Sequence, residues 1–111
     1  MAKNDYYVIA YRILAYIYAC LKEDAAFNPE EISYERLAIP ESYWNVVAVD
    51  LVERGYIKDA FVIPVLRDGK RVKWGIRPIV TMEGVEFLHS NSMMGKAKEF
   101  LKTLKETIPG L

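Results

Sequence analysis

The sequence predicts an α+β domain in which three helices are followed by a β-hairpin and then by further helices. Apolar residues recur with helical spacing up to Gly55. From Tyr56 the chain is rich in β-branched and aromatic residues, and helical spacing returns near Thr81. The 111 residues are 52% hydrophobic and 27% charged, which is the composition of one folded domain over residues 1–111 and not of a disordered chain.

The first helix is predicted to begin after a cap at Asn4 or Asp5 and to end near Lys22. Its apolar stretch, YYVIAYRILAYIYACL, is shorter than the ~20 residues that cross a bilayer and contains Arg12. The basic segment and cleavage site of a signal peptide are not found. We therefore expect a cytoplasmic protein without a membrane segment, in which this helix is buried on more than one side.

The next two helices are predicted from the residues that flank them. A short helix, YERLA, follows the capping residue Ser33. A third helix, PESYWNVVAVDLVER, is predicted to begin at Pro40 and to stop at Gly55. The face that would pack on the first helix has residues at i, i+3, i+4 and i+7: Trp44, Val47, Ala48 and Leu51. The opposite face, predicted to be exposed, carries Ser42, Asn45, Val46, Val49 and Glu53.

Two strands are predicted over residues 56–80. YIKDAFVIPVL has the residue types of a strand, and Asp68-Gly69 favours a tight turn because both residues tolerate positive φ. RVKWGIRPIV returns as the partner strand, where Pro78 indicates an edge position or a bulge. A short helix, TMEGVEFLHSN, and a last helix capped by Ser92 complete a helical extension over about residues 81–108.

Three helices followed by a hairpin, or wing, form the arrangement of a winged helix-turn-helix. In DNA-binding proteins of this kind the third helix enters the major groove with its N-terminal residues leading. The candidate DNA-binding residues on this helix are therefore Ser42, Tyr43 and Asn45. The same helix also carries carboxylates, which repel phosphate: Glu41, Asp50 and Glu53.

Positive charge is concentrated in the predicted wing. Residues 67–80 have a net charge of +4, whereas residues 1–32 and 33–66 each have −2 and residues 81–111 have zero. Cations that neutralise phosphates release counterions, which supplies much of non-specific DNA affinity. The candidate DNA-binding residues in the wing are Arg67, Lys70, Arg71 and Lys73. A charged hairpin tip is also a common solvated feature that discourages aggregation, and this alternative stays open.

The sequence does not predict an enzyme, a cofactor or a metal site. His89 is the one histidine and Cys20 the one cysteine, so the ligand sets of zinc sites are missing. Cys20 lies in an apolar helix, where a thiol usually acts as a small buried hydrophobe. Glu30 and Glu31 follow a proline at the predicted start of a helix and are interpreted as helix-start charges, not as an acid/base pair.

Several motifs resemble those of the YjcQ-like family, small uncharacterised proteins often found in phage-derived regions. The matching residues lie in the first helix (Tyr11-Arg12-Ile13-Leu14), at the exit of the third (Gly55-Tyr56-Ile57), after the wing (Thr81, Gly84, Phe87, Leu88) and before the lysine-rich end (Asn91, Ser92, and the run from Lys96). The resemblance implies a winged-helix fold and no particular activity.

The expected function is that of a phage-type DNA-binding or regulatory protein acting on transcription, which contacts duplex DNA through the third helix and the wing. The alternative is a winged-helix module that binds proteins and has no affinity for DNA. The first helix has a second apolar stripe, Tyr7, Tyr11, Leu14, Tyr18 and Leu21. The last helix would cover this stripe either within one chain or in a homodimer.

Overall fold

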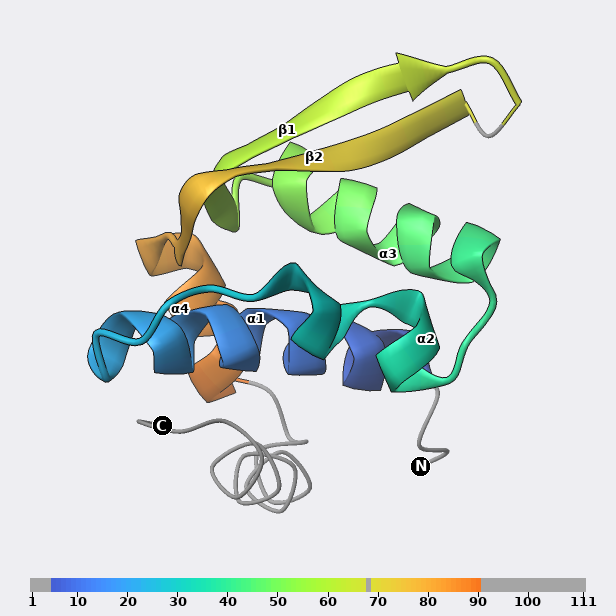
Figure 1. Ribbon diagram of the computed structural model, residues 1–111. Helices are drawn as coiled ribbons and strands as arrows, with labels where there is room; N and C mark the ends of the chain where they lie inside the picture. Colours follow the sequence, from blue (N-terminus) through green and yellow to red (C-terminus); the bar gives the residue numbers. More distant parts are fainter. Residues whose placement is uncertain (1–4, 68, 91–111) are drawn as a thin grey trace.

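The computed structural model describes residues 5–67 and 69–90 and has the predicted α+β architecture (Figure 1). The elements follow one another as α1 (Tyr6–Lys22), the 3₁₀ helix η1 (Pro29–Ile32), α2 (Tyr34–Leu37), α3 (Glu41–Glu53), β1 (Ile57–Val65), β2 (Gly69–Val80) and α4 (Met82–Ser90). The predicted last helix, and with it the predicted homodimer contact, lies outside the described residues.

The predicted helix boundaries agree with the structure to within a residue or two. Asp5 is the N-cap of α1 in extended conformation, although its side chain makes no capping hydrogen bond. The Ser33 hydroxyl caps α2 by accepting from the backbone N–H of Arg36 at 3.1 Å. Pro40 is the N-cap of α3 and not its first residue, and Gly55 follows α3 with a φ of +78°.

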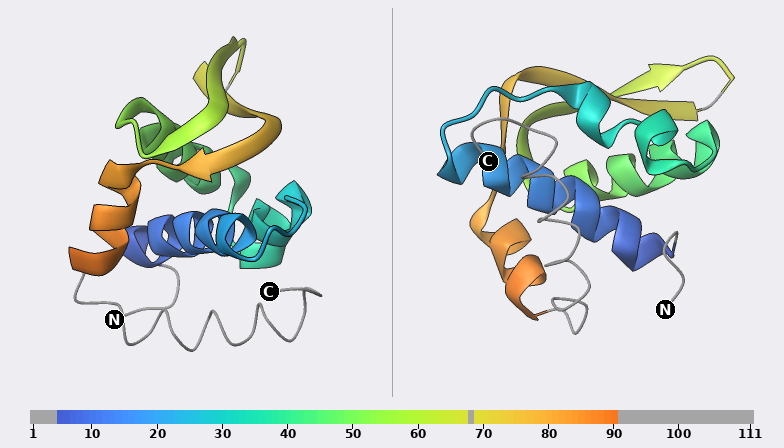
Figure 2. Two further views of the ribbon diagram at one scale, coloured as in Figure 1. Left: turned by 90° about the vertical axis from the view of Figure 1, so that its left-hand side faces the viewer. Right: turned by 60° about the horizontal axis from the view of Figure 1, so that its bottom comes forward.

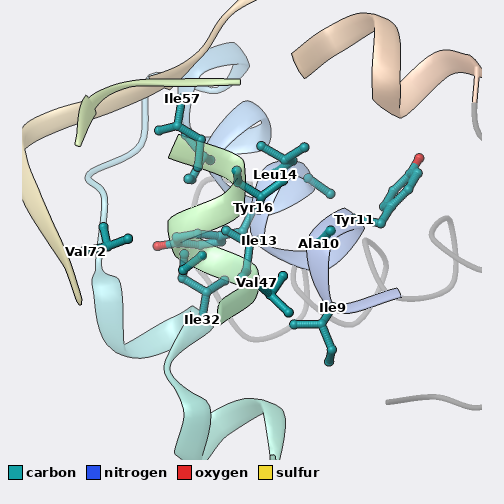
Figure 3. Close-up of a cluster of buried hydrophobic side chains, with 14 of the residues drawn as sticks. Ile9, Ala10, Tyr11, Ile13, Leu14, Tyr16, Ile32, Val47, Ile57 and Val72 are labelled. Carbon is teal, nitrogen blue, oxygen red and sulfur yellow. The ribbon is translucent and has the colours of Figure 1, made fainter. Parts of the chain in front are cut away.

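Helix α3 lies between α1 on one side and the hairpin on the other (Figures 1 and 2). Its predicted apolar face is confirmed, because Trp44, Val47, Ala48 and Leu51 are all buried. Figure 3 shows Val47 of α3 meeting Ile13 of α1 and Ile32 of η1 in the main hydrophobic cluster.

The predicted exposed face of α3 is partly wrong. Asn45 is 6% exposed and Val49 is 8% exposed, so both are buried. The reason is that the hairpin packs along α3, and its inward-facing side chains cover the middle of the face that lies opposite α1. Ser42, Val46 and Glu53 remain exposed, as predicted.

The hairpin is antiparallel and has one large irregularity. Regular pairing runs from Val65↔Gly69 to Ala60↔Trp74 and then resumes at Lys58↔Ile79. Asp59 therefore stands opposite residues 75–78, a bulge that contains Pro78 as the sequence predicts. At the tip, Gly69 has a φ of +80°, which fits the predicted turn, while Asp68 is not among the described residues.

The stripe on α1 that was expected to need a cover is partly covered by α4. Tyr11 and Leu14 are buried, whereas Tyr7 is 58% exposed. The Tyr7 ring stacks on Phe87 of α4 with a centroid distance of 6.4 Å.

Candidate interaction surface

The two faces of the hairpin have different chemistry. Val62 is paired with Val72 and Ala60 with Trp74, and this inner face packs against the core around α3. Successive side chains of a strand point to opposite faces, so the neighbouring pairs Phe61↔Lys73 and Ile63↔Arg71 belong to the outer face. No other element of the described chain lies over this outer face (Figure 1).

The outer face is therefore divided into two rows. Strand β1 supplies the apolar row, in which Phe61 is 54% exposed and Ile63 is partly exposed. Strand β2 supplies the cationic row, with Arg71 and Lys73 exposed. Side chains in directly opposite positions lie ~5 Å apart, so the two rows form one continuous amphipathic surface, which we call the outer hairpin face.

The four cationic residues predicted to bind DNA from the wing lie on different surfaces of the hairpin. Arg71 and Lys73 lie on the outer hairpin face, and Arg67 is exposed at the tip beside Leu66. Lys70 instead turns toward α3, where its Nζ lies 2.8 Å from Glu53 Oε2. Both partners are about half exposed, so this ion pair contributes little stability, but it withdraws Lys70 from the basic surface.

The predicted residues of the third helix are also separated by the structure. Ser42 is exposed, whereas Tyr43 is half-buried with its ring 6.3 Å from the Tyr6 ring. Asn45 is buried under the hairpin, and its Nδ2 atom has no hydrogen-bond partner. At 6% exposure, this amide presents little surface to a DNA base.

Between the hairpin tip and the N-terminal end of α1 lies a groove of about 470 Å³. Its floor includes Val46 and Val49, and its other lining residues are Tyr6, Ser42, Asn45, Asp50, Glu53, Gly69 and Lys70. Val46 is 59% exposed at this groove. We call the surface of α3 that lines the groove, from Ser42 to Glu53, together with the exposed Glu41 that precedes it in the chain, the α3 stripe.

Asp50 organises one wall of the groove. The Tyr6 hydroxyl donates to Asp50 Oδ2 at 2.8 Å, and Arg54 Nε donates to Asp50 Oδ1 at 3.0 Å. Burial, followed by the hydrogen bond to the Asp50 carboxylate, raises the pKa of Tyr6 to about 12. The hydrogen bond from Arg54 to the other oxygen of Asp50 raises the pKa of Arg54, so both donors remain protonated at neutral pH.

The sequence model of one family, described as YjcQ protein, matches residues 11–107. The chain belongs to the YjcQ family. No curated protein matches the sequence. No solved structure matches it either.

The family motifs after the third helix have structural roles. Thr81 Oγ1 donates to the Gly55 carbonyl at 2.6 Å and accepts from the Gly84 N–H at 3.2 Å, which ties the end of α3 to the start of α4. A Cβ on Gly84 would lie 2.6 Å from the Tyr56 carbonyl oxygen, and the Phe87 ring packs 5.6 Å from the Tyr56 ring. These residues therefore hold the base of the hairpin, and their pattern says little about a ligand.

None of the helices in the described part of the chain is both long enough and apolar enough to cross a membrane. Within residues 5–67 and 69–90, no three histidine, cysteine, aspartate or glutamate side chains are grouped closely enough to hold a metal ion.

The exposed apolar row of β1 was missed by the sequence analysis. The signal was present, because Phe61 and Ile63 alternate with the inward-facing Ala60 and Val62. The charge pattern indicates only the cations of β2, and not the apolar residues that stand opposite them.

Proposed function

We propose that this protein is a winged-helix domain that recognises other protein surfaces and does not read DNA bases. The helix-turn-helix assignment is supported by the short connection of residues 38–40 between α2 and α3. Ala38 in this connection has a φ of +58°, a left-handed conformation that turns the chain sharply into the next helix. The hairpin that follows α3 corresponds to the wing.

The observation that carries the proposal is the chemistry of the α3 stripe. Asn45, the best adenine-reading side chain on this helix, lies under the hairpin. Glu41 and Glu53 are exposed on the stripe, and Asp50 is partly exposed. Carboxylates near DNA repel its phosphates, whereas Asp50 and Glu53, which line the groove with the exposed Val46, suit a partner surface that combines apolar and cationic groups.

The test is a fluorescence-anisotropy titration of labelled mixed-sequence and single-sequence duplexes at low and moderate salt. We expect no sequence preference, and no difference between the wild type and a Ser42→Ala variant. A sequence-specific complex that is weakened by Ser42→Ala would contradict the proposal, because Ser42 is exposed on the N-terminal turn of α3. Asn45→Ala serves as a second variant, since a base-reading Asn45 would also be required for such a complex.

Non-specific contact with duplex DNA is a second candidate function, favoured by one observation. Arg67 and Lys73 are exposed and form no ion pair with any residue that the structure describes. If they contact phosphates, the double variant Arg67→Ala/Lys73→Ala flattens the log–log salt dependence of binding by roughly two units, at about 0.9 per contact. A regulatory role in transcription would depend on this contact.

A further inference from the structure

We propose that the outer hairpin face binds a second copy of this chain, by docking on the α3 stripe and the groove beside it. This inference rests on the proposed protein-binding function and names the partner. It follows from three features of the molecule: the chemistry of the outer hairpin face, the complementary chemistry of the α3 stripe, and the absence of net charge that would keep two copies apart.

The outer hairpin face requires a partner that is both apolar and acidic. Phe61 is 54% exposed and Ile63 partly exposed on this face, while Leu66 at the tip and Ile76 in the bulge, outside the paired rows, are 107% and 99% exposed. Lys73 stands directly opposite Phe61, so a side chain that covers Phe61 comes within reach of the ammonium group. A partner with carboxylates beside an apolar groove satisfies both groups.

The α3 stripe has this composition. Val46 and Val49 form an apolar floor, and the groove volume of about 470 Å³ lies within the range of about 300–1,000 Å³ typical of ligand pockets. Glu41 stands at one end of the stripe and Glu53 at the other. Glu53 is 47% exposed in its pair with Lys70, so its carboxylate can accept a further cation from outside.

The chain carries an acidic segment around α3 and a basic segment in the hairpin, so two copies can bring opposite charges together. The net charge of zero does not oppose this association. Residues 33–66, which include α3, have a net charge of −2, while residues 67–80 have +4 and the whole chain has zero. A protein with no net charge has no long-range repulsion between copies, and its separated charges attract when opposite ends meet. The carboxylates that disfavour DNA at α3 therefore favour the cationic hairpin of another copy.

Each contact joins two different surfaces, so neither the hairpin face nor the α3 stripe binds a copy of itself. Each copy offers one hairpin face and one α3 stripe. Association either proceeds head to tail or closes when two copies exchange both contacts. This geometry makes a specific prediction about mixtures of variants, which a contact between two identical surfaces would not share.

The experiment measures the weight-average mass of the full chain by sedimentation equilibrium. At low salt, and between about 10 μM and 1 mM, we expect the mass to rise above the 12.8 kDa of the monomer. Raising the salt to about 0.5 M shortens the Debye length to a few ångströms and should return most of the protein to monomer.

Two sets of substitutions then separate the surfaces. The hairpin variant is Phe61→Ser/Lys73→Glu, and the stripe variant is Glu41→Lys/Val46→Lys. All four side chains are exposed, and circular dichroism melts verify that each variant folds. Each variant measured by itself should associate at least tenfold more weakly than the wild type. An equimolar mixture should regain association, since one variant retains the hairpin face and the other the stripe.

The matched controls are Lys22→Glu in α1 and Glu86→Lys in α4, which change charge by the same amounts as Lys73→Glu and Glu41→Lys at exposed sites on other elements. They should associate as the wild type does. If the hairpin variant fails to fold, Leu66→Ser/Arg67→Ser at the tip replaces it, with the same expected result.

Three results would overturn the inference: a wild-type mass that stays at 12.8 kDa up to about 1 mM at low salt, association that survives in both variants, or a mixture that regains nothing. The last result would indicate a contact between identical surfaces. None of the three restores base reading, so the duplex titration with Ser42→Ala still decides the proposed function. Conversely, sequence-specific DNA binding by a chain that does not self-associate would contradict both the proposed function and this inference.

Discussion

At the scale of single residues, Trp44 connects three parts of the molecule. Its Nε1 donates to the backbone carbonyl of Ile32 at 2.7 Å, which joins α3 to the segment before α2. Its ring meets the Trp74 ring of β2 edge-on, with a centroid distance of 6.4 Å. The side chain is 8% exposed, so both the hydrogen bond and the ring contact are shielded from water.

Replacing this side chain should separate its two contributions. Trp44→Ala is expected to lower the free energy of unfolding by about 3–5 kcal/mol, because it removes a large buried ring. Trp44→Phe keeps much of the ring contact and leaves the Ile32 carbonyl without its donor, which is expected to cost about 1–2 kcal/mol. Urea melts measure both losses, and equal effects of the two variants would show that ring burial contributes little.

Tyr6, at the edge of the groove, makes the stability of the folded protein depend on pH. Its pKa is about 12 in the folded protein and 10.0 for a free tyrosine, so folding favours the protonated form. The stability that Tyr6 contributes is therefore fully present below pH 10 and is lost as the pH rises toward 12.

The comparison of wild type with Tyr6→Phe isolates this effect. At pH 7 the wild type should be more stable by about 1 kcal/mol, because only it has the hydrogen bond to Asp50. The difference should shrink as the pH is raised above 10. Chemical denaturation at a series of pH values measures it, and a difference that remains constant up to pH 11 would contradict the assigned hydrogen bond.

At the scale of elements, local signals in the sequence predicted most of the fold. Ser33 and Gly55 set helix ends within a few residues of themselves, and Pro78 marked a bulge, so neighbouring residues were sufficient evidence. The burial of Asn45 and Val49 was not predictable in this way. It depends on how the hairpin folds back over α3, which is a contact between distant segments.

The contact of α4 with the base of the hairpin gives a prediction with an unusual sign. In most helix interiors, Gly→Ala stabilises by roughly 1 kcal/mol. Gly84→Ala should instead destabilise by about 1–3 kcal/mol, because the added methyl group would strike the Tyr56 carbonyl and Val80. Thermal or urea melts decide the sign, and a stabilised variant would show that α4 does not lie this close to the hairpin.

At the scale of the whole molecule, the proposed function depends on how charge is distributed and not on its sum. The concentration of positive charge between residues 67 and 80 was visible from the sequence. The pairing of Lys70 with Glu53 and of Arg77 with Asp24 was not, because both pairs join segments that are far apart in the chain. Arg67 and Lys73 form no ion pair within the part of the chain that the structure describes, and they stand beside exposed apolar side chains, a combination suited to a protein partner.

The most direct test of this account is a comparison of amide chemical shifts between dilute and concentrated samples of ¹⁵N-labelled protein at low salt. We predict that the shifts that change belong to the outer hairpin face, around Phe61 and Lys73, and to the α3 stripe, around Val46. Both sets should return to their dilute values when salt is added. Changes confined to α1 and α4, or spectra that do not depend on concentration, would contradict the claim that hairpin and α3 together form a protein-binding surface.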